Sequence, residues 1–143
     1  MRILRLHLQN VHALRNQWTI QFDQFPLYEA GLFAITGPTG GGKSSLLDAM
    51  IVALYGRVPR YGHNTPTDLM TRHTAETLIE LDFAVQQGRF RARWNLRRAR
   101  GQATGRVQPA RHELQNLDTN QTLDLRSSDV PKEVEKLTGL NME

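Results

Sequence analysis

Two stretches near the start of the chain alternate between apolar and polar positions. Leucines occupy positions 4, 6 and 8 of the first stretch, and Trp18, Ile20 and Phe22 occupy the apolar positions of the second. A period of two is typical of a strand with one buried face. Because only a short connection separates the two stretches, we predict that the chain opens with a β-hairpin.

The pattern then changes twice. Residues 32–35 are continuously apolar, which is typical of a strand covered on both faces. From Ser44, apolar residues recur at the spacing of a helix with one buried face, at positions 46, 47, 50, 51, 53 and 54. Turn-forming residues in the segment 56–73 end this helix and predict an exposed loop with one short helical turn at 68–70.

A second hairpin is predicted where residues 87–88 form a turn. This register sets Phe83 opposite Ala92 on one face and Asp82 opposite Arg93 on the other. Every pair on the first face is then apolar, as the buried side of a hairpin requires.

The remaining pattern is weaker and completes a single domain. It predicts strands at 112–117 and 122–125 and a helix that Ser128 or Asp129 caps and Gly139 ends. The chain contains no repeat and no internal linker.

Residues 37–44 fit the phosphate-binding pattern G-x-x-x-x-G-K-[ST], between a predicted strand and a predicted helix as this motif requires. Glycines permit positive φ and leave the backbone bare, so that successive N–H groups turn toward a phosphate. The residues predicted to bind the nucleotide are Gly37, Pro38, Thr39, Gly40, Gly41, Gly42, Lys43, Ser44 and Ser45.

Three side chains of this loop have predicted roles. Lys43 reaches the β- and γ-phosphates and stabilises their charge, the Ser44 hydroxyl binds Mg²⁺, and Ser45 donates to the α-phosphate. The alternative is a glycine-rich turn without a ligand. Each glycine in ordered structure costs about 0.5–1 kcal/mol relative to alanine, which disfavours that alternative. We therefore predict ATP and Mg²⁺ as ligands.

The charge of the chain is concentrated in one segment. The formal net charge is +4, yet residues 89–111 contain eight arginines and no acidic residue. A local excess of arginine favours a polyanionic partner or ion pairs with carboxylates. The candidate DNA-binding residues are Arg91, Arg93 and Arg97 on the polar face of the second hairpin, and the alternative is that they pair with Glu80 and Asp82.

Several other classes of protein or site are disfavoured. The chain has no cysteine, so it has neither disulfides nor thiolate metal sites. No apolar run approaches a membrane span, and we expect a cytoplasmic protein without a membrane partner. The five histidines, at 7, 12, 63, 73 and 112, lack the close spacing of metal ligands.

Four stretches together resemble the N-terminus of the SbcC family, the ATPase subunits of bacterial SbcCD nucleases within the SMC-like double-strand break repair ATPases. They read MRILRLHLQNVHALRNQWTIQF, GLFAITGPTGGGKSSLLDAMIVALYGRVPR, DLMTRHTAETLIELDFAV and RFRARWNLRRAR. The resemblance extends over nearly the whole chain. GPTG-x-GK-[ST]-[ST]-LLDA with LALYG-like and DLMTR segments is more specific than the phosphate loop alone.

The resemblance implies an α/β (mixed) fold in which residues 1–143 form the N-terminal half, incomplete, of an ABC-type P-loop ATPase head with a mixed or antiparallel sheet. It implies four partners: an SbcD-type nuclease subunit, DNA, a second copy of the head, and the protein's own C-terminal half. It places ATP on residues 37–45, Mg²⁺ on Ser44, and the adenine and ribose near the 10–14 connection, with Asn10 and His12 as candidate contacts.

The family's Gln loop, signature motif, Walker B acids and switch histidine have no counterpart in these residues. The resemblance therefore implies that the 143 residues bind ATP without hydrolysing it. Asp48, one turn after Ser44, is interpreted as a packing residue and not as a replacement for the Walker B acid.

Other functions remain open at this point. One is another SMC-like head, similar to RecF or RecN, without a nuclease partner; DLMTR and the arginine-rich hairpin favour SbcC. A transporter ATPase or a small P-loop kinase is disfavoured, because the aromatic residue that precedes the loop in transporters and the kinase lid are missing. A nucleotide-binding module without turnover is the fourth possibility.

Overall fold

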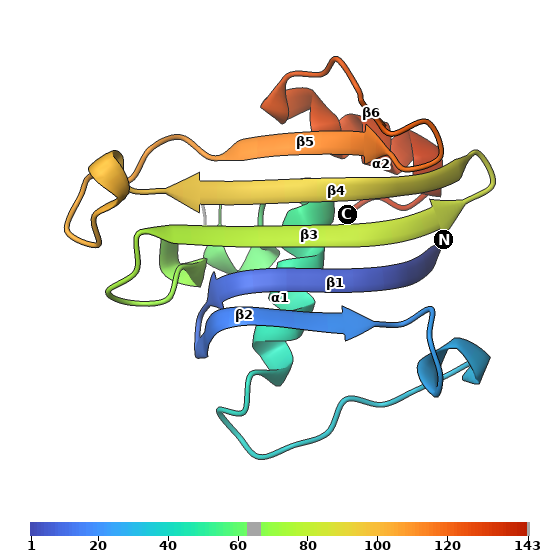
Figure 1. Cartoon of the computed structure of the whole chain (residues 1–143), viewed down its shortest axis with the longest axis horizontal. Coiled ribbons are helices and arrows are strands. Elements are labelled where there is room, and N and C mark those ends of the chain that lie inside the picture. The colour runs from blue at the N-terminus through green and yellow to red at the C-terminus, as the bar shows by residue number, and fades with distance from the viewer. Residues whose placement is uncertain (63–66, 143) are drawn as a thin grey trace.

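The computed structural model describes residues 1–62 and 67–142, and its centre is one antiparallel sheet of six strands in the order β2-β1-β3-β4-β5-β6 (Figure 1). The strands are β1 (Arg2–Val11), β2 (Leu14–Gln21), β3 (Glu76–Val85), β4 (Gly88–Arg97), β5 (Arg111–Asn116) and β6 (Gln121–Thr122). The α-helices are α1 (Lys43–Tyr55) and α2 (Val130–Thr138). Short 3-10 helices span Leu27–Glu29, Pro59–Tyr61, Thr67–Leu69, Ala99–Gly101 and Ser127–Asp129.

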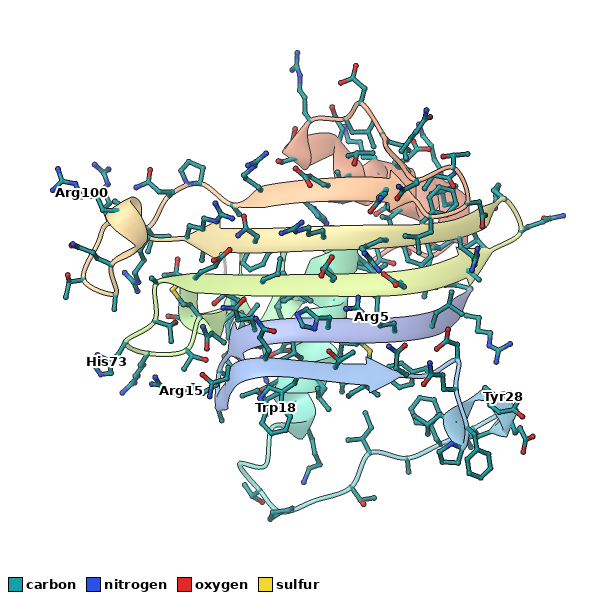
Figure 2. All side chains as sticks on the ribbon, viewed as in Figure 1. Arg5, Arg15, Trp18, Tyr28, His73 and Arg100 are labelled. Carbon is teal, nitrogen blue, oxygen red and sulfur yellow. The ribbon has the colours of Figure 1, made fainter. Side chains whose placement is uncertain are left out.

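Both α-helices lie on one face of the sheet, and the other face is open (Figure 1). Between the helices and the sheet lies an apolar core built from alternate residues of the central strands, with Leu81, Phe83 and Trp94 almost fully buried. The open face carries charged side chains such as Arg5, and Arg15 and Arg100 lie toward one end of the sheet (Figure 2). This two-layer arrangement confirms the predicted mixed α/β fold class.

The first hairpin is confirmed. β1 pairs antiparallel with β2, with Leu6 opposite Ile20 and Leu8 opposite Trp18. Two non-glycine residues with positive φ lie at this turn, Asn10 near the end of β1 and His12 in the connection to β2.

The second hairpin forms, but its predicted register is wrong by two residues. Phe83 lies opposite Phe90, and Asp82 lies opposite Arg91. The turn therefore occupies residues 86–87, and Gly88 already belongs to β4 with φ +136°. Because side chains alternate with a period of two, a two-residue shift leaves every residue on its predicted face and changes only its partner.

The prediction of a buried strand at 32–35 is wrong. Residues 31–38 form no strand, and the side chains of Leu32, Phe33 and Ile35 are 92%, 45% and 40% exposed. A strand needs a neighbour for its N–H and C=O groups, and no described strand lies beside this segment. The apolar run indicates burial without indicating which chain segment would cover it.

Helix α1 begins and ends where predicted, with left-handed Gly42 and Gly56 at its two caps. The face it buries agrees in part with the prediction, because Ala53 and Leu54 are buried as expected and the centre of the buried face is shifted toward Ala49 and Val52. Ala49, Val52 and Ala53 face the core, whereas Leu47 is 56% exposed. Small residues let the helix approach the sheet closely, which places the larger leucine on the outer side.

The later elements agree in part with the prediction. β5 and α2 are confirmed, while the strand expected at 122–125 is reduced to the two residues of β6. The helical turn in the segment 56–73 is confirmed at Thr67–Leu69, but the expected exposure is wrong at Leu69, Met70 and Thr71, which are buried. Residues 63–66 of this loop, including His63, lie outside the described residues.

Candidate functional site

The loop 37–42 leads from the exposed apolar segment into α1, and its backbone depends on glycine at two positions. Gly40 and Gly42 have φ of +80° and +94°, values that residues with a Cβ rarely adopt. The Gly41 N–H donates to the Pro38 carbonyl at 3.1 Å and closes a turn. The glycines thus occur where the chain needs left-handed backbone to enter the helix.

The loop rests on the start of β2. A Cβ atom at Gly42 would lie 2.9 Å from Cδ2 of Leu14, so the glycine backbone packs directly on that side chain. Gly42 is also the N-cap of α1, and its carbonyl accepts the first helical hydrogen bond, from the Leu46 N–H at 3.1 Å. The β1–β2 hairpin therefore supports the loop.

Three side chains at the N-terminus of α1 differ in their accessibility. Ser44 is exposed, Lys43 is partly exposed, and Ser45 is buried. The Lys43 ammonium donates to the carbonyls of Gly37 and Pro38, the latter at 3.1 Å. A recess at this point is lined by Ala13, Thr39, Gly40, Gly42, Lys43, Ser44 and Ser45.

The electrostatics of this recess favour an anion. The first N–H groups of a helix have no partner within the helix, and the dipole of α1 places partial positive charge beside them. The first turn of α1 contains no acidic residue, and Lys43 adds a full positive charge. The recess thus combines backbone donors, an ammonium group and three hydroxyl groups, which suits a polyphosphate.

The two candidate contacts in the β1–β2 connection have different surroundings. The amide of Asn10 donates to the Glu76 carbonyl at 3.0 Å and accepts from the Asn16 N–H at 2.8 Å, so it fixes the turn. The ring of His12 lies beside the phosphate loop, with Nδ1 3.1 Å from the Ser45 hydroxyl oxygen. Burial lowers the pKa of His12 below its ordinary value, against an opposing effect of Asp48.

Asp48 is buried below the loop, one helical turn after Ser44. Arg60 donates to its carboxylate, and the Tyr61 hydroxyl lies 3.4 Å from the same oxygen. Both partners come from the short 3-10 helix that follows α1. The sequence pattern carries no signal for Arg60 or Tyr61, because it predicts a plain exposed loop for their segment.

The three arginines predicted to bind DNA differ in their ion pairs. Arg91 donates to both carboxylate oxygens of Asp82, at 2.6 and 2.9 Å, and Arg97 donates to Glu76 at 3.1 Å. Arg93 is exposed and makes no ion pair within the described residues. The predicted pairing of Asp82 with Arg93 is thus replaced by Asp82 with Arg91, as the shifted register requires.

Residues 5–137 match the family model described as "AAA domain". The chain belongs to this family. It is 39% identical over 99% of its length to the SbcC component of the SbcCD nuclease of Pseudomonas aeruginosa and 38% identical over 100% to that of Rhodobacter capsulatus. It is also 28% identical over 99% of its length to the "Probable DNA double-strand break repair Rad50 ATPase" of Aquifex aeolicus. These similarities confirm the resemblance to SbcC, and the chain spans 13% of the length of each of these relatives.

The fold is shared with a solved structure, the SMC head domain from Thermotoga maritima. The TM-score is 0.58 at 18% identity, over 93% of this chain and 42% of that chain. This match confirms the prediction of an SMC-like ATPase head fold.

Two kinds of feature are absent from the described residues, 1–62 and 67–142. No helix there is both long and apolar enough to cross a membrane. No group of three or more histidine or acidic side chains in that part of the chain is placed to hold a metal ion.

Proposed function

We propose that this chain is the ATP-binding part of an SbcC-type ATPase and that residues 37–45 hold the triphosphate. The observation that carries the proposal is the loop at the start of α1. Left-handed Gly42 caps the helix, and Lys43 and Ser44 line the recess. The similarity to SbcC-type proteins supports ATP over other phosphate ligands.

Lys43 and Ser44 have different proposed roles in binding the nucleotide. Lys43 exchanges the carbonyls of Gly37 and Pro38 for the β- and γ-phosphates and offsets their charge. Mg²⁺ prefers oxygen ligands and takes several from the substrate phosphates and from water, so the exposed Ser44 hydroxyl fits as a single protein ligand. When bound there, Mg²⁺ would supply positive charge beside the phosphates that Lys43 and Ser44 hold.

We assign ATP turnover to the whole protein and only ATP binding to these residues. Phosphoryl transfer needs a carboxylate that helps to hold the metal and a group that orients water. The carboxylate of Asp48 is buried and engaged by Arg60 and Tyr61, which supports a structural role for it.

The exposed apolar segment 32–35 suits an intramolecular partner. Leu32, Phe33 and Ile35 are more exposed than is usual for such residues in a stable domain, and the chain spans 13% of the length of its relatives. We propose that strands of the protein's own C-terminal half cover this segment and complete the head. A second head and an SbcD-type nuclease subunit are the further protein partners that we propose, in the cytoplasm.

DNA is the proposed substrate of the whole complex. On the open face of the sheet, Arg93 lies opposite Glu80 and Glu113 and is the candidate that makes no ion pair within 4.0 Å among the described residues. Arg91 and Arg97 are engaged in ion pairs. Contacts of arginine with phosphates fix position without reading sequence, as end and hairpin processing requires.

The proposal is tested by titrating the chain with a fluorescent ATP analogue in the presence of Mg²⁺. Lys43→Ala is expected to abolish saturable binding, because it removes the only full positive charge of the recess residues. Lys136→Ala is the matched control, since Lys136 lies on α2 and pairs with Glu133. Equal binding by wild type, Lys43→Ala and Lys136→Ala would overturn the phosphate-loop assignment.

A further inference from the structure

The ring of His12 lies between the phosphate loop and the 3-10 helix Pro59–Tyr61. Its Nδ1 is 3.1 Å from the Ser45 hydroxyl oxygen, and its Nε2 is 2.8 Å from the Tyr61 hydroxyl oxygen. The two rings meet edge to face, with centroids 6.0 Å apart and an angle of 86° between their planes. Both ring nitrogens of His12 therefore have a polar partner. The partner of Nδ1, Ser45, belongs to the predicted phosphate-binding residues 37–45.

The backbone holds His12 firmly in this place. Its φ is +48°, a left-handed value that costs a non-glycine residue about 1–2 kcal/mol. Its N–H donates to the Leu69 carbonyl at 2.8 Å, and its carbonyl accepts from the Thr71 hydroxyl at 2.7 Å. Leu69 and Thr71 are buried, so these bonds fix the point from which the ring projects.

The direction of the hydrogen bonds follows from Arg60. A guanidinium group only donates, so the Tyr61 oxygen accepts from Arg60 at 3.1 Å and must give its own proton elsewhere. The Nε2 of His12 lies at 2.8 Å and the carboxylate of Asp48 at 3.4 Å. Donation along the shorter contact makes Nε2 the acceptor, whereas donation to Asp48 would require a proton on Nε2.

A neutral imidazole that accepts at Nε2 carries its proton on Nδ1. Burial lowers the pKa of His12, which favours this neutral form at neutral pH. The carboxylate of Asp48, 4.0 Å from Nδ1, favours a proton on that nitrogen. The Nδ1–H group then donates to the oxygen of Ser45, whose own proton stays free.

We propose that His12 is a positioning residue of the phosphate loop, which orients the Ser45 hydroxyl so that its proton points to a phosphate oxygen. Arg60 and Tyr61 set the tautomer of His12, and Asp48 holds Arg60 in place. This inference rests on the proposed function, because it assigns Ser45 as a phosphate donor. It also gives the polar cluster of Asp48, Arg60 and Tyr61 below the loop a role in nucleotide binding.

The first test reads the tautomer and needs no nucleotide. Two-bond ¹H–¹⁵N correlation spectra of the chain, with the His12 signals identified from their loss in His12→Asn, report which ring nitrogen carries the proton. We expect protonated Nδ1 and unprotonated Nε2 in the wild type. Tyr61→Phe removes the donor to Nε2 and should shift the ring toward the opposite tautomer. A wild-type ring protonated at Nε2 would overturn the inference.

The second test measures the affinity for Mg²⁺–ATP. The loss of one hydrogen bond that orients a donor should weaken binding about 2- to 10-fold in His12→Ala and in Tyr61→Phe. His12→Asn should recover part of this loss, because its amide N–H lies near the position of Nδ1 and still donates to Ser45. A merely structural role would not distinguish asparagine from alanine in this way.

Matched controls separate this inference from the proposed function. His7→Ala removes a histidine that bonds Thr19 on β2, and Tyr55→Phe removes a hydroxyl that bonds Leu140 at the far end of α1; both should bind ATP like the wild type. If Lys43→Ala abolishes binding while His12→Ala and Tyr61→Phe leave it unchanged, the inference is wrong and the proposed function stands. If Lys43→Ala has no effect, the proposed function is wrong, and the tautomer spectrum still decides the direction of the hydrogen bonds.

Discussion

His112 joins strand β5 to the C-terminal end of α1, and its replacement is expected to destabilise the fold. The side chain is 4% exposed, and its Nε2–H group donates to the Ala53 carbonyl at 2.7 Å. Ala53 lies among the last four residues of α1, whose carbonyls have no partner within the helix. The histidine therefore satisfies a buried carbonyl that the helix leaves open.

The expected loss of stability in His112→Ala follows from the buried Ala53 carbonyl. His112→Ala leaves it buried without a donor, which costs about 1–3 kcal/mol, and the loss of packing around the ring adds to this. For a domain of this size, each kcal/mol lowers the midpoint of thermal unfolding by about 3–6 °C. His112→Gln keeps an amide donor and should retain more of the stability than His112→Ala.

The same site predicts a dependence of stability on pH. Burial lowers the pKa of His112 in the folded protein below its value in the unfolded chain. Protonation would place a positive charge on a side chain that is only 4% exposed. As the pH falls, the unfolded state therefore binds the proton first. The contribution of His112 to the free energy of unfolding is complete above the ordinary histidine pKa and decreases as the pH falls through that pKa.

The assay is thermal or urea unfolding of wild type, His112→Ala and His112→Gln at a series of pH values from 8 down to about 5. The two variants lack the histidine, so their free energy of unfolding should decrease less on acidification than that of the wild type. His7 and His12 remain in all three proteins, so the differences between the proteins report His112. Equal stability of wild type and His112→Ala at pH 8, or equal pH slopes in all three proteins, would refute the reasoning.

Two further predictions concern the loop and the open face of the sheet. Gly42→Ala should weaken Mg²⁺–ATP binding and lower the free energy of unfolding by about 1–2 kcal/mol, because an alanine at φ +94° is strained and its Cβ meets Leu14. Calorimetry and ATP titration measure the two effects. Gly31→Ala is the control, since a Cβ atom there meets nothing within 4 Å. Arg93→Ala should weaken binding of a DNA duplex and reduce the slope of log affinity against log salt by about one, and a slope equal to that of the wild type would argue against DNA on this face.

The phosphate loop and the faces of the strands could be predicted from sequence because each depends on local rules. Gly40 and Gly42 occupy the positions where the loop needs positive φ, and the alternation in β1 and β3 identifies their buried sides. The motif also fixes the start of α1, since the helix must begin where its N–H groups face the phosphates. These inferences need no knowledge of distant contacts.

The errors arise where a distant partner decides the outcome. The run at 32–35 is apolar, but a strand forms only beside another strand, and none of the described strands lies there. The pattern places Arg60 and Tyr61 in an exposed loop because nothing in their own segment indicates Asp48 or His12 as partners. The cluster below the phosphate loop is therefore visible only in three dimensions.

The two-residue error in the second hairpin shows how a small change in register alters a functional argument. With either register, Arg91 and Arg93 stay on the polar face, so the charge pattern of that face is unchanged. The partner does change: Asp82 lies opposite Arg91 and neutralises it through two hydrogen bonds, whereas the predicted register assigns that carboxylate to Arg93. The carboxylate in such a pair offsets the charge of the arginine and occupies two of its five donors, so a paired arginine attracts a phosphate less strongly than an unpaired one. Arg93, which is exposed and makes no ion pair among the described residues although Glu80 and Glu113 lie opposite it, is therefore the arginine of this strand most accessible to a polyanion, and the DNA experiment replaces Arg93 alone.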